Sequence, residues 1–236
     1  MQNYIEMLKK DVRFEEGLNA CMNCGVCTAI CPAAEFYNYD PRQIVDMVQS
    51  ENNEEIEKLL KSETIWYCGE CMSCKTRCPR GNTPAFIVMS LRTLSQKLGF
   101  FTESEKGRQQ FAIKRTVGEN IFKYGYCVAT YALSPEMHRE QGPVWEYMLD
   151  HTTEIYERLG GRINEIGEGP LRKIPDDVKE ELKRIFEVTG GTELFDTIEE
   201  HSKKKAEEMG LEFKDKGIDN EYFKEVFSAN NKKHTL

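Results

Sequence analysis

Apolar residues recur at the three- and four-residue spacing of amphipathic helices along most of the chain. In the first hundred residues this pattern predicts short helical turns within 3–18, a helix starting at Asp40, and helices over 53–61 and 82–98. Asp40 and Pro41 suit the N-cap and the first helical position, and Gly99 suits the end of the last helix. Residues 32–40 are expected to form a loop.

After Thr102 the helical pattern continues with more charged residues. Further helices are expected over 105–124, 144–159, 175–188, 192–209 and 220–227, with a glycine-containing loop over 160–175. We therefore expect an all-α fold with two parts. Residues 1–101 would form a helical domain and residues 102–236 a helical C-terminal extension, whose polar tail from 228 to 236 is expected to be disordered.

Composition and charge narrow the class of protein. A net charge of -8 over 236 residues, with a pI near 5.3, argues against nucleic acid and anionic membranes as partners. No apolar run reaches the ~20 residues that a membrane span needs. The amphipathic N-terminus lacks the apolar segment of a signal peptide. These features predict a cytoplasmic protein with reduced thiols.

The nine cysteines supply the candidate chemistry. All but Cys127 lie in two copies of C-x2-C-x2-C-x3-C-P, at 21–32 and 68–79, related by a constant offset of 47 residues. This is the bacterial pattern for [4Fe–4S] clusters, in which the fourth cysteine binds the other cluster. We therefore expect one cluster on Cys21, Cys24, Cys27 and Cys78, and a second on Cys68, Cys71, Cys74 and Cys31.

Other interpretations of the cysteines are weaker. Structural zinc usually takes two separated C-x2-C pairs for each ion, and disulfides would need an exported chain.

Cys127, among tyrosines, is expected to be a small buried apolar residue, and Trp66 and Tyr67 are expected to cover a cluster. The four histidines are scattered and expected at the surface.

Charge near the motifs suggests that the two clusters differ in reduction potential. Lys75, Arg77 and Arg80 flank the second motif, whereas no basic residue lies between Cys21 and Pro32. Which cluster has the higher potential stays open, because two of these cations flank a ligand of the other cluster. The sequence has no fingerprint for a flavin or a nicotinamide nucleotide, so we expect the chain to carry electrons and not to catalyse turnover alone.

The doubled motif, the segments 40–45 and 65–68, and Cys78-Pro79-Arg80-Gly81 together resemble the iron–sulfur C subunit of heterodisulfide reductase. The resemblance is specific over about residues 14–100 and looser to about 175. It implies an α-helical ferredoxin with two [4Fe–4S] clusters on the eight motif cysteines. It also implies electron relay between two partners, a flavin-containing, iron–sulfur A subunit and a cysteine-rich B subunit, within an oxidoreductase that acts on disulfide or sulfur compounds.

The C-terminal portion is expected to be longer than in the methanogen versions of that family, with added helices after Pro175. The resemblance therefore extends to bacterial heterodisulfide-reductase-like complexes of sulfur oxidation and to bifurcating complexes of anaerobes. The alternatives are a free two-cluster ferredoxin, an iron–sulfur subunit like that of succinate dehydrogenase or fumarate reductase, and a zinc-stabilised module. The extension is expected either to dock a partner or to cap the ferredoxin core.

Overall fold

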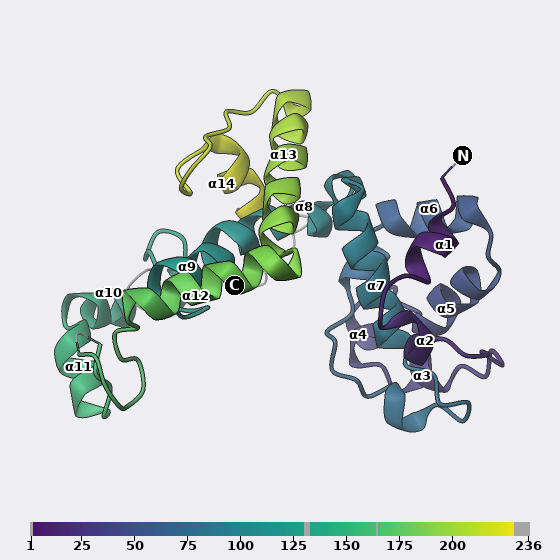
Figure 1. Cartoon of the computed structure of the whole chain (residues 1–236), viewed down its shortest axis with the longest axis horizontal. Coiled ribbons are helices and arrows are strands. Elements are labelled where there is room, and N and C mark those ends of the chain that lie inside the picture. The colour runs from purple at the N-terminus through teal and green to yellow at the C-terminus, as the bar shows by residue number, and fades with distance from the viewer. Residues whose placement is uncertain (1, 130–132, 164, 229–236) are drawn as a thin grey trace. The chain divides into compact units, whose positions relative to one another are not determined.

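A computed structural model describes residues 2–129, 133–163 and 165–228 (Figure 1). The described residues contain many helices and no strand, which confirms the predicted helical class. They divide into two compact units. Unit 1 comprises Met1–Gln110 and Thr197–Phe213, and unit 2 comprises Phe111–Asp196 and Lys214–Leu236. None of the described helices is both long enough and apolar enough to cross a bilayer.

Unit 1 contains the two cysteine motifs and the helices around them. Its α-helices are α1 (Tyr4–Leu8), α2 (Phe14–Gly17), α3 (Val26–Ala29), α4 (Pro32–Phe36), α5 (Pro41–Gln49), α6 (Asn53–Lys61) and α7 (Pro84–Lys97). Short 3-10 turns lie at η1 (Thr64–Trp66), η2 (Lys75–Arg77) and η3 (Phe100–Glu103). The long helix α13 (Gly191–Met209) contributes its residues from Thr197 onward to the same unit.

Helix capping explains where the helices of unit 1 begin. The Asp40 carboxylate accepts a hydrogen bond from the Gln43 N–H, as predicted for an N-cap, and Pro41 is the first helical residue. Gly99 follows α7 with φ of 77°, a left-handed conformation that favours glycine. The expected loop over 32–40 is wrong in its first half, because Pro32 opens the short helix α4.

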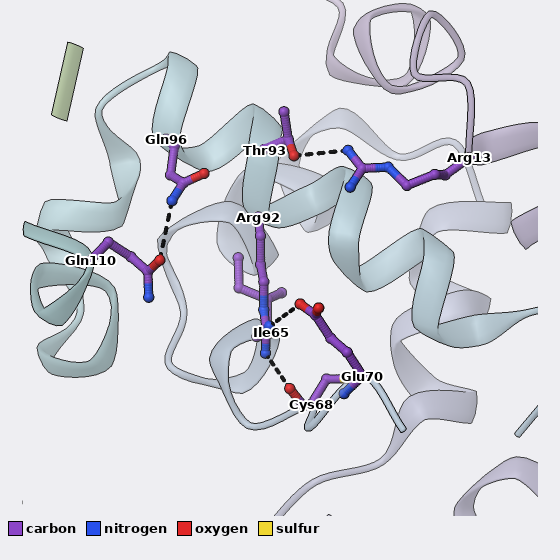
Figure 2. A network of polar contacts seen from close by, with 8 residues as sticks. All are labelled: Arg13, Ile65, Cys68, Glu70, Arg92, Thr93, Gln96 and Gln110. Atoms are coloured by element: carbon purple, nitrogen blue, oxygen red, sulfur yellow. Dashed lines mark hydrogen bonds and ion pairs between the residues drawn. The ribbon is translucent and has the colours of Figure 1, made fainter. Parts of the chain in front are cut away.

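Helix α7 is the central element of unit 1 and contacts α1, α2, α5 and α6. The fully buried side chains between these helices form one apolar core, which includes Ile44, Val48, Ile56, Leu60, Ile65, Ile87 and Leu91. Arg13, beside α2, donates a hydrogen bond of 2.9 Å to the Thr93 hydroxyl on α7 (Figure 2). This core holds the helices that support the two motifs.

Close approach between α2 and α7 depends on Gly17. A Cβ added there would lie 2.7 Å from Cδ1 of Ile87. The Gly17 carbonyl also accepts a hydrogen bond of 3.0 Å from the Thr83 N–H, just before α7. The first motif begins four residues after Gly17, so this contact helps to position it.

Unit 2 is helical and rich in aromatic contacts. It includes part of α8 (Glu105–Ile113) and of α13, together with η4 (Lys114–Gly118), α9 (Glu119–Tyr124), η6 (Arg139–Gln141), α10 (Pro143–Asp150), α11 (Thr152–Arg158), α12 (Asp176–Thr189) and α14 (Glu221–Ser228). The Phe122 ring lies 4.8 Å from that of Phe186 and 5.9 Å from that of Phe195. These contacts join α9, α12 and α13 into one unit.

Two predicted helices of unit 2 differ from the structure. The helix expected over 105–124 contains a π-helical segment at η4, where the buried Arg115 guanidinium donates to the carbonyls of Lys214 and Gly217. The helix expected over 144–159 is interrupted at His151, so α10 and α11 are separate.

Cys127 is exposed, so the expectation that it is buried is wrong. The tail expected to be disordered lies outside the described residues, apart from Ser228.

Candidate metal centre

The eight motif cysteines line two separate hollows in unit 1. Cys21, Cys24 and Cys27 of the first motif and Cys78 of the second line one hollow. Cys68, Cys71 and Cys74 of the second motif and Cys31 of the first line the other. The two hollows are of similar size. Each quartet that the sequence analysis assigned to one cluster thus lies around one hollow, and the role of these thiols as ligands stays a prediction.

The donor set of each hollow suits an iron–sulfur cluster. In each quartet three cysteines are half-buried and one, Cys24 or Cys71, is exposed, and none of the eight forms a disulfide. Cubane ligands bind different iron atoms and so surround a volume, which is the arrangement at both hollows.

The two cysteine loops share the same backbone geometry. Asn23 and Glu70 occupy equivalent positions in the two motifs, with φ of 58° and 53°. The N–H of each donates to the Sγ of the cysteine two residues before it, at 3.4 Å in both loops. Such N–H···S bonds stabilise the charge of a thiolate. The repeat in sequence is therefore also a repeat in local conformation.

A second pair of equivalent residues in the two loops also has a left-handed backbone conformation. Gly25 has φ of 79°, and Met72, its equivalent, has φ of 60°. Glycine adopts this conformation at little cost. The left-handed backbone at this position is not evident from the sequence, because the second motif has methionine there.

Arg42 holds the first loop from helix α5. Its guanidinium donates to the Asn23 side chain at 2.7 Å and to the Asp40 carboxylate at 3.0 Å, and it lines the first hollow. The Asp40 carboxylate also accepts a hydrogen bond of 2.5 Å from the Thr28 hydroxyl on α3. Asp40 therefore caps a helix and joins it to both the arginine and the first motif.

Arg92 holds the second loop from helix α7 (Figure 2). Its guanidinium donates to the carbonyls of Ile65 and Cys68 at 2.6 and 2.7 Å, and to the Glu70 carboxylate at 2.6 Å. Its side chain is only 16% exposed, and its guanidinium carbon lies 5.5 Å from the centre of the Trp66 ring. A single side chain thus fixes both the approach to the second motif and the loop itself.

Burial opposes ionisation of the innermost thiols when no metal is bound. It raises the pKa of Cys27 to about 11 and also raises the pKa of Cys74. A hydrogen bond with Ser73 lowers the pKa of the exposed Cys71. Iron binds cysteine as thiolate, and the charge of the metal offsets this cost of burial.

The second hollow also receives the buried tyrosine Tyr39. This residue is 4% exposed and lines the hollow together with Cys68. Burial is the main cause that raises the pKa of its hydroxyl, so the group stays neutral. It can therefore supply a hydrogen-bond donor to a cluster ligand without adding charge.

Several expected site residues lie elsewhere. Trp66 and Tyr67 do not line either hollow. They pack against the apolar core, and the Tyr67 ring stacks on that of Tyr37 at 4.5 Å. Lys75 forms an ion pair with Glu16. Of the three cations near the second motif, only Arg80 lines a hollow, and it is the first one.

Sequence comparisons identify relatives of the region that holds the hollows. Residues 17–82, which include all eight motif cysteines, match a family described as 4Fe-4S dicluster domain. The chain is 38% identical to the C subunit of the Ferredoxin:CoB-CoM heterodisulfide reductase of Methanosarcina acetivorans over 157 residues, which are 66% of this chain and 60% of the relative.

Two further relatives have similar names. Identity is 32% over 118 residues to the iron-sulfur C subunit of the CoB--CoM heterodisulfide reductase of Methanopyrus kandleri, covering 48% of this chain and 60% of the relative. It is 33% over 106 residues to the C subunit of the H(2):CoB-CoM heterodisulfide,ferredoxin reductase of Methanothermobacter marburgensis, covering 45% and 56%. The chain therefore spans between 56% and 60% of the length of these relatives. Because the aligned residues make up 66% of this chain and 60% of the Methanosarcina acetivorans relative, that relative is the longer of the two, and the expectation that this chain extends beyond the methanogen versions is wrong for it.

Proposed function

The chain is a homologue of the heterodisulfide reductase C subunits, and we propose that it carries electrons through two [4Fe–4S] clusters between partner subunits. One cluster is bound by Cys21, Cys24, Cys27 and Cys78, and the other by Cys68, Cys71, Cys74 and Cys31. The observation that supports this assignment is the lining of the hollows, each of which has three cysteines of one motif and the fourth of the other.

The chain's own residues hold and orient these ligands. Bound clusters supply one-electron redox chemistry. Arg42 and Arg92 brace the two loops, and the N–H groups of Asn23 and Glu70 direct hydrogen bonds at ligand sulfurs. The exposed Cys24 and Cys71 bring an edge of each site to the surface of unit 1, where electrons can be exchanged.

The proposed partners are a flavin-containing, iron–sulfur A subunit and a cysteine-rich B subunit, the second of which would carry out the disulfide chemistry. The chain itself would be non-catalytic and cytoplasmic. Residues 1–101 are proposed as the α-helical ferredoxin domain and residues 102–236 as a helical extension that docks a partner or caps this domain. The names of the relatives support the subunit role, since each is the C subunit of a heterodisulfide reductase.

Co-purification from the native cell under anaerobic conditions tests this proposal. The tagged chain is expected to retain a flavin-bearing protein together with a cysteine-rich one. Elution as a cluster-loaded monomer would instead support a free two-cluster ferredoxin. Recovery with a [2Fe–2S] protein and a dicarboxylate-oxidising flavoprotein would support a succinate dehydrogenase or fumarate reductase type of complex.

A further inference from the structure

The two hollows differ in the cationic side chains that line them. Arg42 and Arg80 line the first hollow, whereas no lysine or arginine lies among the described residues that line the second. Arg42 is paired with the Asp40 carboxylate at 3.0 Å. Arg80 is exposed and forms no ion pair within the described parts of the chain. The first hollow therefore carries a positive charge that no partner offsets.

Asn23 and Glu70, which occupy equivalent positions in the two cysteine loops, also differ in charge. Asn23 in the first loop carries a neutral amide, and Glu70 in the second carries a carboxylate. The backbone nitrogen of each residue lies 3.4 Å from the first cysteine sulfur of its loop, so the two side chains extend from equivalent backbone positions beside a ligand. The Glu70 carboxylate is bound by Arg92, and the charges of this pair offset one another.

Reduction adds one negative charge to a cluster. A nearby cation stabilises the reduced form and raises the potential, and a nearby carboxylate has the opposite effect. The charge imbalance is thus positive at the first hollow and absent at the second.

We propose that the cluster on Cys21, Cys24, Cys27 and Cys78 has the higher reduction potential and is reduced first. Arg80 raises the potential of the first-motif cluster, and Glu70 keeps that of the second-motif cluster low by offsetting the charge of Arg92, so these two residues set the gap. This inference rests on the proposed function, because it requires both clusters. It means that an electron entering the chain rests on the first-motif cluster, and that the second-motif cluster is the stronger reductant.

Potentiometric titration of the intact chain, followed by EPR at low ionic strength, tests the assignment. Arg80→Gln is expected to lower the higher midpoint and leave the lower one unchanged. Glu70→Gln is expected to raise the lower midpoint and narrow the gap. Each variant should change the reduced-to-oxidised ratio of its cluster, at the wild-type midpoint, by several-fold and at most about tenfold, which is 59 mV for a one-electron couple.

Two controls keep the outcomes distinct. Lys58→Gln removes a cation on α6 that lines neither hollow and should shift neither midpoint. Arg42→Gln should shift the same midpoint as Arg80→Gln, with iron content showing whether the cluster is retained. A single shared midpoint, an Arg80→Gln shift of the lower midpoint, or no shift would overturn the inference while leaving both clusters in place. A chain without iron–sulfur signals would instead refute the proposed function.

Discussion

Arg92 is the side chain whose loss should weaken the second motif most directly. It makes three hydrogen bonds, to the carbonyls of Ile65 and Cys68 and to the Glu70 carboxylate, all between 2.6 and 2.7 Å. The side chain is 16% exposed and Ile65 is fully buried, so water cannot replace these bonds without rearrangement. Arg92→Gln removes the charge and most of the donors while keeping a polar side chain of moderate length.

The magnitude follows from the partners left behind. A buried carbonyl without a donor costs about 1–3 kcal/mol, and a bond to a charged donor contributes about 1.5–3 kcal/mol. The Glu70 carboxylate is 41% exposed, so its ion pair contributes less, about 0–1 kcal/mol. Allowing for one bond retained by glutamine, we expect Arg92→Gln to lower the free energy of unfolding of unit 1 by about 3 kcal/mol.

Anaerobic urea unfolding measures this effect through two signals, visible cluster absorption and far-ultraviolet circular dichroism. Lys58→Gln is the matched control, since the Lys58 ion pair with Glu55 is exposed and its loss should leave the midpoint unchanged. Arg92→Gln should lower both midpoints and lose the second-motif cluster first. Equal midpoints for the two variants would refute the argument that the guanidinium supports the loop.

Three further predictions test other parts of the structure. Gly17→Ala should lower the free energy of unfolding by about 1–3 kcal/mol, because the added methyl group would lie 2.7 Å from Ile87, and a urea midpoint equal to wild type would contradict this. Cys31→Ser should diminish the EPR signal of the second-motif cluster more than that of the first, whereas Cys127→Ser should leave both intact, and loss of the first-motif signal alone would overturn the cross-ligation. Burial lowers the pKa of His201 below its usual 6.5, so the unfolded chain binds more protons than the folded one near that pH. The free energy of unfolding should therefore fall as the pH drops from 6.5 towards the lowered pKa. The urea midpoints of His201→Asn should depend less on pH than those of the wild type, and an unchanged dependence would contradict this.

Much of unit 1 could be predicted because its signals are local. The cap at Asp40 and the glycine after α7 mark helix ends in the sequence itself, and both lie where they were expected. The cysteine spacing likewise predicted which thiols would lie together. The start of α4 at Pro32 differs from the expected loop, because a proline after a cysteine can end one element and also begin the next.

The parts that could not be predicted depend on contacts between distant segments. Arg42 and Arg92 lie 19 and 22 residues from the loop side chains they bind, and no local pattern distinguishes them from surface arginines. The exposure of Cys127 was missed for a similar reason, since its tyrosine neighbours in sequence suggested a core that the fold does not place there. A single sequence therefore leaves long-range pairing largely undetermined, together with helix breaks such as that at His151.

Iron and acid-labile sulfide analysis of the anaerobically purified chain, together with EPR of the reduced protein, tests the central claim most directly. The proposal of two [4Fe–4S] clusters predicts about eight iron atoms and about eight sulfides for each chain, with signals from two interacting clusters. Stoichiometric zinc without sulfide, or about four iron atoms with a single cluster signal, would contradict it.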